Sequence, residues 1–142
     1  MRKLIISAEN DLPERALCCT AKKAAKATGK LLGRPFCAGL LFTDDENIRR
    51  LNGQFRGVDR ETDVLSFPSG AEGYLGDIAI SLPCAQRQAD EIGQSLEREV
   101  AFLTAHAMLH LFGYDHHTQP EEDAMRAMQR KVMHRLGYGA EG

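Results

Sequence analysis

Short apolar runs predict four β-strands in this chain of 142 residues. They lie at residues 4–7, 38–42, 62–67 and 76–81, and the last run alternates apolar and polar positions with a period of two. We expect Pro68 to stop the third strand, because proline cannot donate a backbone hydrogen bond to a neighbouring strand. Residues 69–74 then form a glycine-containing loop.

Capping residues and helical spacing predict helices around these strands. Asp11 and Pro13 favour the start of a first helix that runs to about Thr28, where Gly29 and Gly33 loosen the chain.

Two shorter helices are predicted further along the chain. Residues 43–45 cap a helix that ends near residue 55, and Pro83 begins another that ends near residue 92.

The longest helical periodicity follows Ser95, which we expect to cap the helix. Leu96, Val100, Leu103 and Leu111 recur there at helical spacing and should bury against the sheet.

Thr118 and Glu121 form a T-x-x-E capping box for a last helix, which Gly137 ends. Its residues expected to face inward are Met125, Met128, Val132 and Leu136.

The complete pattern is that of one α+β domain over residues 1–142, with a sheet of about four strands packed with four or five helices.

Three histidines on and after the long helix form the most informative motif. His106, His110 and His116 have the spacing H-x-x-x-H-x-x-G-x-x-H. Residues four apart share one face of a helix, so His106 and His110 can direct two nitrogens at one metal ion. Gly113 can end the helix in a left-handed conformation, after which the reversed chain brings His116 round as a third ligand. Three protein ligands with a fourth position left to water are typical of catalytic zinc sites, although three scattered histidines are the simpler alternative.

The residue after the first histidine separates this motif from that of the metzincin proteases. Those proteases carry Glu there as a general base, whereas this chain has Ala107. This weakens the peptidase interpretation, because metal-bound water would need another proton acceptor.

Other polar residues near the motif have two interpretations. Asp115 either forms the turn after Gly113, or orients a ligating histidine or accepts a proton from metal-bound water. His117 is expected to point away from its neighbour His116, and His134 to lie at the surface or in packing.

Arg56 lies upstream in a segment flanked by glycines. Its guanidinium could bind a phosphodiester through two hydrogen bonds and stabilise charge on the oxygens. Alternatively, it forms a salt bridge to Asp59 or Glu61.

The net charge of −2 conceals an uneven distribution. Residues 1–60 carry 12 Lys and Arg against 7 Asp and Glu, whereas residues 61–142 carry 6 against 13. Four lysines at helical spacing, followed by Arg34, form either a solvated helix face or a surface for a polyanion. These lysines are Lys22, Lys23, Lys26 and Lys30.

No secretory or membrane segment is predicted. The apolar run near the start is too short for a signal peptide, and no stretch approaches a membrane span. The four cysteines lack C-x-x-C spacing, so we expect reduced, mostly buried thiols in a cytoplasmic protein. They are Cys18, Cys19, Cys37 and Cys84.

Three sequence blocks together resemble the bacterial YbeY family. In chain order they are Leu-Asn-Gly-Gln-Phe-Arg-Gly-Val-Asp-Arg-Glu-Thr-Asp-Val-Leu-Ser-Phe, Leu-Gly-Asp-Ile-Ala-Ile-Ser and His-Ala-Met-Leu-His-Leu-Phe-Gly-Tyr-Asp-His. The resemblance covers roughly residues 40–137. The family usually has Gly after the first histidine, where this chain has Ala107, a better helix former.

The resemblance implies a zincin-like α+β fold and a single-metal endoribonuclease of ribosomal RNA processing, including 16S rRNA maturation, and of ribosome quality control. It implies His106, His110 and His116 as ligands of one metal ion, and Arg56 as the functional arginine. Zn²⁺ is the expected ion, although imidazole also suits nickel, cobalt or copper. The expected partners are RNA and ribosomal particles, together with a ribosomal protein or an assembly GTPase, and no membrane.

Two other functions remain open from the sequence. One is a zincin-like metallopeptidase or amidohydrolase, which the histidine spacing supports and Ala107 opposes. The other is a ribosome-binding module with a structural metal, which needs a fourth protein ligand such as Cys84 or Asp115.

Overall fold

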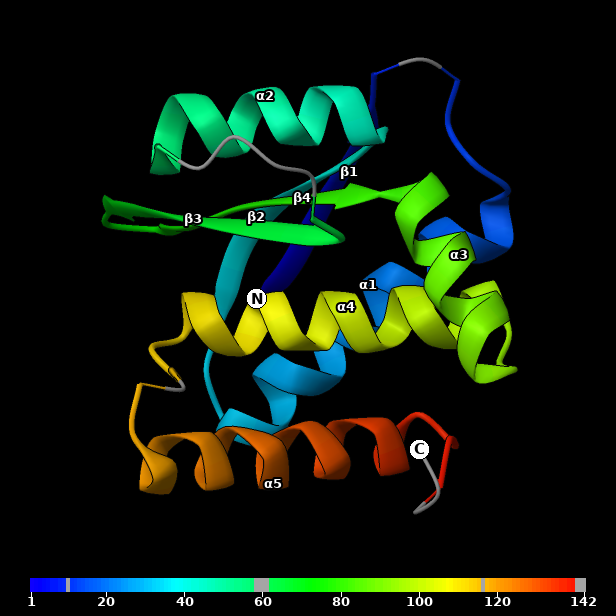
Figure 1. Cartoon of the computed structure of the whole chain (residues 1–142). Helices are drawn as coiled ribbons and strands as arrows, with labels where there is room; N and C mark the ends of the chain where they lie inside the picture. The colour runs from blue at the N-terminus through cyan, green and yellow to red at the C-terminus, as the bar shows by residue number, and fades with distance from the viewer. Residues whose placement is uncertain (10, 58–61, 116, 140–142) are drawn as a thin grey trace.

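A computed structural model describes residues 1–9, 11–57, 62–115 and 117–139 (Figure 1). Its sheet has four strands: β1 (Arg2–Ala8), β2 (Phe36–Thr43), β3 (Val64–Ala71) and β4 (Tyr74–Ser81). The strand order is β1-β2-β4-β3, in which β1, β2 and β4 are parallel and β3 runs antiparallel to β4 at one edge.

Five helices surround this sheet within the described ranges. They are α1 (Arg15–Leu32), α2 (Asp45–Arg56), α3 (Leu82–Ile92), α4 (Leu96–Leu111) and α5 (Gln119–Arg135). Helix α2 lies on one face of the sheet, whereas α4 lies on the other, with α5 on the far side of α4 (Figure 1). The expected α+β fold, with about four strands and four or five helices, is therefore confirmed.

Alternation along the strands supplies a core on each face of the sheet. Leu40, Ile78 and Ile80 are buried towards α1 and α4, where they join Val100 and Met108 in the main core. A smaller cluster lies beneath α2 and contains Ile48, Leu65 and Ala79. Each fully buried leucine, isoleucine, valine or methionine side chain contributes about 1.5–3 kcal/mol relative to exposure, so the sheet is stabilised from both sides.

The third strand continues past Pro68, contrary to the expectation that proline would stop it. β3 runs to Ala71 and pairs only with β4, with a register irregularity between Pro68 and Ala71. An edge strand tolerates proline because its outward N–H positions need no partner. Residues 69–71 are therefore part of the strand, and Gly73, with a φ of 85°, lies in the turn to β4.

The first helix begins and ends later than expected. α1 starts at Arg15 and continues through Gly29 to Leu32, because Gly33 adopts the left-handed conformation, with a φ of 66°. A Cβ atom on Gly29 would lie 2.8 Å from Cε2 of Phe36. Gly29 therefore permits close packing of the Phe36 ring on the helix instead of ending it.

Side-chain burial also differs from the expectation in two places. In α5 the buried residues are Met125, Gln129, Val132 and Met133, whereas Met128 and Leu136 are only half-buried. All four cysteines are free thiols, but Cys19 is exposed and the other three are half-buried, so the expected burial is wrong. His134 is exposed, as expected.

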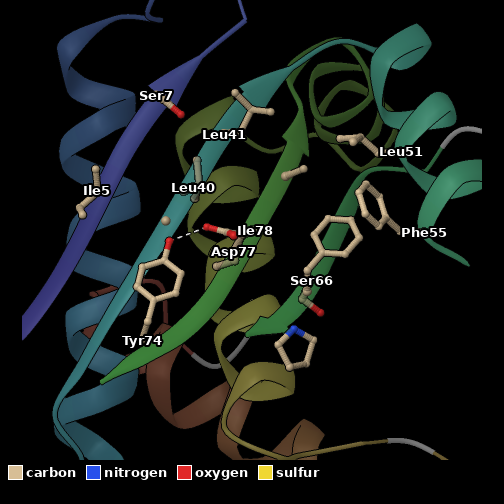
Figure 2. Close-up of a pocket in the computed structure, with 14 residues that line it drawn as sticks. Ile5, Ser7, Leu40, Leu41, Leu51, Phe55, Ser66, Tyr74, Asp77 and Ile78 are labelled. Carbon is tan, nitrogen blue, oxygen red and sulfur yellow. Dashed lines mark hydrogen bonds between the residues drawn. The ribbon is translucent and has the colours of Figure 1, made fainter. Parts of the chain in front are cut away.

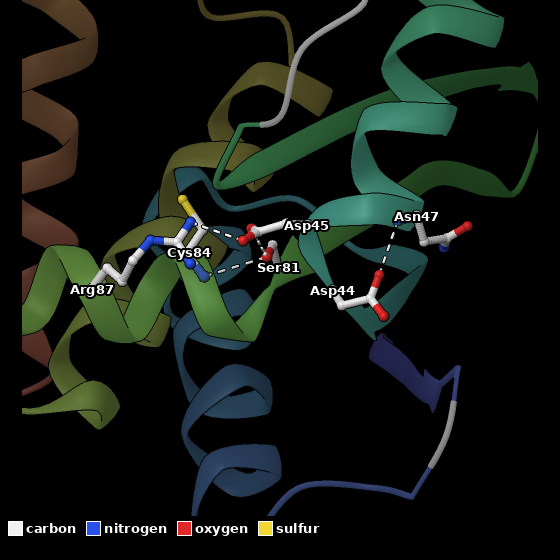
Figure 3. A network of polar contacts seen from close by, with 6 residues as sticks. All are labelled: Asp44, Asp45, Asn47, Ser81, Cys84 and Arg87. Atoms are coloured by element: carbon white, nitrogen blue, oxygen red, sulfur yellow. Dashed lines mark hydrogen bonds and ion pairs between the residues drawn. The ribbon is translucent and has the colours of Figure 1, made fainter.

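A polar network joins the start of α2 to the start of α3 (Figure 3). The hydroxyl of Ser81, which is fully buried, donates to Oδ1 of Asp45 at 2.8 Å and accepts from the backbone N–H of Cys84 at 3.3 Å. Arg87 forms an ion pair with Oδ2 of Asp45 at 2.9 Å. Ser81 therefore caps α3, and Asp45 fixes α2 against it.

We expect Asp45→Ala to lower the free energy of unfolding by about 1–3 kcal/mol, because the buried Ser81 hydroxyl loses its acceptor. Arg87→Ala is the matched control, since the arginine side chain is 54% exposed and its ion pair should contribute less than about 1 kcal/mol. Urea unfolding of both variants tests this order. Equal decreases in the free energy of unfolding would show that the ion pair, and not the hydrogen bond of the buried hydroxyl, stabilises the contact between α2 and α3.

Candidate active site

A single stripe of α4 reaches the surface beyond its first turn. Between residues 99 and 111 every side chain is buried except those of Phe102, His106 and His110. These residues are four positions apart, so they lie above one another on one face. The ring of His106 stacks on Phe102 with centroids 6.2 Å apart, and it meets His110 edge-to-face at 4.8 Å.

The end of α4 has the geometry that the motif predicted. Gly113 has a φ of 108°, and its N–H donates to the carbonyl oxygen of His110 at 3.0 Å. The N–H of Tyr114 donates to the carbonyl oxygen of Leu109 at 2.9 Å. The chain therefore reverses directly after the second histidine, as expected.

A contact from another part of the chain holds this end of the helix in place. Arg34 donates from Nη1 to the carbonyl oxygen of Phe112 at 3.3 Å, and its guanidinium lies 4.8 Å from the centroid of the same ring. The ring of Phe112 also packs edge-on against Phe36, with centroids 6.0 Å apart. Arg34 is thus a structural residue as well as a member of the basic segment.

A cleft of about 510 Å³ separates the histidines from the edge strand β3. One wall is His106, Ala107 and His110 of α4, and the floor and opposite wall come from β3 and the residues just before it. Its other lining residues are Thr62, Asp63, Val64, Leu65, Ser66, Pro68, Gly113, Tyr114, Asp115 and His117. Residues 62–66 of this lining belong to one of the three sequence blocks, but no chemical role was predicted for them.

Asp115 enters the same cleft as the two histidines. Its Oδ2 lies 3.0 Å from Nε2 of His117, and the two side chains are 38% and 78% exposed. His117 lines the cleft as well, and its predicted divergence from His116 stays a prediction, because His116 lies outside the described residues. The turn after α4 therefore brings a carboxylate and an imidazole to the mouth of the site.

The other three predicted site residues are not among the described residues seen in the cleft. His116 lies outside the described residues. Arg56 ends α2, and its side chain is also outside the description. Cys84 starts α3 beside Ser81 and does not line the cleft, so the structure does not bring it to the histidines (Figure 3).

The two described histidines fit a metal ion by donor chemistry and by geometry. Both are half-buried on one helix face, and their 4.8 Å ring separation suits two nitrogens each about 2.0–2.1 Å from one zinc ion. The described residues contain no cluster of three His, Cys, Asp or Glu side chains, and the expected third ligand is not among them.

One buried carboxyl group lies near the start of α4. Glu99 is 3% exposed, and burial raises its pKa above the ordinary 4.5. The hydrogen bond from Nε2 of Gln94, at 2.6 Å, opposes this shift, and the charge of Asp63 adds to it. Asp63 lines the cleft, so Glu99 responds to the electrostatic environment of the site.

Comparison with known proteins decides the family. A family model described as Endoribonuclease YbeY matches residues 7–137. The chain belongs to the YbeY family.

Relatives within the YbeY family cover most of the chain. A protein named Endoribonuclease YbeY from Desulforamulus reducens is 52% identical over 109 residues, which span 70% of this chain and 71% of the relative. A relative of the same name from a Roseiflexus species is 43% identical over 145 residues, spanning 94% of this chain and 87% of the relative. The solution structure of TM1509 from Thermotoga maritima is also similar, with a TM-score of 0.62 and 26% identity over 94% of this chain and 91% of that one.

This YbeY-family chain also has a hollow on the opposite face of the sheet, of about 840 Å³ (Figure 2). At its centre the hydroxyl of Tyr74 donates to Oδ1 of Asp77 at 2.5 Å. Gly39 makes room for this pair, because a Cβ there would lie 2.6 Å from both oxygens. Burial, together with Asp77, raises the pKa of Tyr74 to about 12, so the phenol stays protonated and remains a donor.

None of the helices described here is long and apolar enough to cross a membrane.

The buried carboxyl group predicts a particular dependence of stability on pH. Because the folded protein raises the pKa of Glu99, the wild type should lose stability as pH rises from about 4.5 through the raised value. Glu99→Gln removes this loss, so its stability relative to wild type should increase between pH 4 and 7, by about 1.4 kcal/mol per unit of pKa shift. Urea unfolding across this range is the measurement.

Glu97→Gln is the control, since Glu97 is exposed in the same turn of α4. A stability difference between Glu99→Gln and wild type that does not change with pH would contradict the expectation.

Proposed function

We propose that this protein is a metal-dependent endoribonuclease that cleaves single-stranded RNA, with ribosomal RNA as its natural substrate. The observation that carries the proposal is the stripe of His106 and His110 along one wall of a cleft, in a chain of the Endoribonuclease YbeY family. Names of relatives support the RNA substrate, and ribosomal particles are proposed partners on the resemblance described above.

The proposed metal ion is Zn²⁺, held by His106 and His110, with His116 as the third ligand implied by the motif. When bound, such an ion stabilises negative charge on phosphoryl oxygens and lowers the pKa of a bound water. The stacking of Phe102 on His106 restricts the orientation of that imidazole before any ligand arrives. Restricted rotation of this kind reduces the entropy lost on binding.

Three further residues are proposed to supply proton transfer and charge. Oδ2 of Asp115 is already paired with Nε2 of His117, so a proton can pass between these atoms at the mouth of the cleft. Arg56 is proposed to stabilise the phosphodiester charge. Its position at the end of α2 follows from the helix cap at Gly57, with a φ of 70°.

The surface of α1 offers a route for the RNA backbone. Lys22, Lys23, Lys26 and Lys30 are all exposed along this helix. Charge of this kind binds phosphates without regard to sequence and is strongly screened by salt.

A peptidase remains the rival enzyme, and the cleft gives it little support. Ala107, which stands where metzincins have their glutamate, is 1% exposed and packs in the main core. A peptide bond needs its amine leaving group protonated, whereas a phosphodiester chiefly needs charge stabilisation and an aligned nucleophile. For the structural-metal rival, Asp115 is the candidate fourth ligand that lines the cleft.

The metal assignment predicts different consequences for two variants. His110→Ala should lose bound zinc and RNA cleavage together, because one of three protein ligands is removed, while the helix keeps its buried residues. Arg56→Glu should keep its zinc and lose cleavage, because the arginine is proposed to act on the phosphate alone. Elemental analysis and RNA cleavage of both variants are the measurements. A full equivalent of zinc in His110→Ala would refute the ligand assignment.

The substrate class is tested with metal-loaded and chelated protein on single-stranded RNA, structured RNA, casein and short peptides. We expect metal-dependent cleavage of single-stranded RNA alone, with binding that weakens steeply as salt rises. Hydrolysis of a peptide that disappears in His106→Ala would establish the peptidase instead.

A further inference from the structure

A second hollow adjoins the candidate active site along the same stripe of α4. It occupies about 470 Å³ between α4 and α5. His106 lines both this hollow and the cleft beside β3, so the two adjoin on either side of the proposed metal ligand. Phe102, one turn earlier on the stripe, lies in the new hollow and not in the cleft.

The walls of the hollow suit a flat, apolar ring. Phe102 is 38% exposed, and the ring of His106 stacks on it. A flat ring that enters the hollow could therefore extend this pair of stacked rings. Met125 and Met133 of α5 also line the hollow. Methionine is unbranched and flexible, so these side chains can adjust around an inserted ring.

A buried polar atom at the same place has no hydrogen-bond partner in the described part of the chain. Gln129 is 6% exposed and lines the hollow. Its Nε2 donates to the carbonyl oxygen of Phe102 at 3.1 Å, which leaves Oε1 with no hydrogen bond among the described residues. Buried acceptors are nearly always satisfied, so this oxygen points to a ligand N–H that reaches it when the neighbouring methionines shift.

Positive charge lies beside the hollow. Arg130 is exposed on α5 and has no ion-pair partner within the described part of the chain. Arg126, one turn earlier, is already paired with Glu122 at 2.6 Å. Arg130 is therefore the cation available to a phosphate.

We propose that this hollow binds one nucleobase of the RNA strand, in the nucleotide next to the cleaved phosphodiester. The base stacks on Phe102, an N–H of the base donates to Oε1 of Gln129, and Arg130 pairs with the adjoining phosphate. Stacking on aromatic side chains combined with hydrogen bonds to base edges is how proteins recognise single-stranded RNA. This inference rests on the proposed ribonuclease function and adds to it a determinant of where the strand is cut.

The test uses the metal-loaded protein and a single-stranded oligoribonucleotide that the wild type cleaves at one mapped bond. Each nucleotide in turn is replaced by an abasic one, and kcat/KM is measured. One abasic position beside the mapped bond should lower kcat/KM by roughly 5- to 150-fold, the range that corresponds to one stacked base. Phe102→Ala should lower cleavage of the parent strand and abolish the difference between parent and abasic strands at that position.

A fluorescent base gives a readout that does not depend on cleavage. 2-Aminopurine at the same position should lose fluorescence on rapid mixing with the wild type, before any product forms, because it stacks. Phe102→Ala should not quench it.

Matched substitutions separate the polar contributions. With adenine at this position, replacing it by purine removes its exocyclic amine, which should weaken binding to the wild type but not to Gln129→Met. Arg130→Ala should weaken binding of all strands by a similar factor, whereas Arg135→Ala, an exposed arginine later in α5 that does not line the hollow, should leave binding unchanged.

The possible failures are distinguishable. If the wild type cleaves RNA but no base position matters, or if the preference survives in Phe102→Ala, the inference is overturned and the proposed function stands. If the wild type cleaves no RNA with metal bound, the proposed function is overturned and this inference with it.

Discussion

The enclosure of α4 is the constraint on which the site depends. This helix contacts the sheet through β3 and β4, and it also packs against α1, α3 and α5. A helix that is apolar on almost every side is stable only when it is surrounded. The one stripe left open carries Phe102, His106 and His110, so the rings reach the surface in a single register. Rotation of the helix by one residue would bury both imidazoles and expose core side chains.

Small side chains make this enclosure possible. Ala101 packs with Ala24 and Met133, and one turn later another alanine of α4 is enclosed in the same way between α1 and α5. Ala107 has a comparable position on the sheet side, where it is part of the main core and of the cleft wall. A glutamate there would place a carboxylate against apolar neighbours, which costs several kcal/mol unless the charge is paired. The same packing that positions the histidines therefore disfavours a metzincin-type base.

Local signals in the sequence were sufficient for the order and type of the elements, and for placing two of the three motif histidines on one helix face. The caps at Asp44, Ser95 and Thr118 all form as predicted, because each depends on a hydrogen bond to a residue three positions away. The spacing of His106 and His110 is equally local.

Tertiary context decided what the sequence could not. Pro68 lies within a strand because β3 is at an edge, and Gly29 lies within a helix because Phe36 packs on it. Neither fact is visible before the strand order and the packing partner are known. The hollow between α4 and α5 was missed for the same reason. Phe102 and Gln129 are 27 positions apart, and each taken alone has the pattern of an ordinary helix residue.

The charges around His106 are opposite in sign on its two sides. The cleft towards β3 contains the carboxylates of Asp63 and Asp115, whereas the hollow towards α5 has Arg130 beside it. A nucleic-acid strand that crosses the stripe would thus meet repulsion on the side where cleavage is proposed. A divalent cation on His106 and His110 would reverse the local sign, because a bound ion is the largest charge in such a site. Metal binding and RNA binding should therefore be coupled, since His106, one of the two imidazoles proposed to hold the ion, lies between the two charged regions.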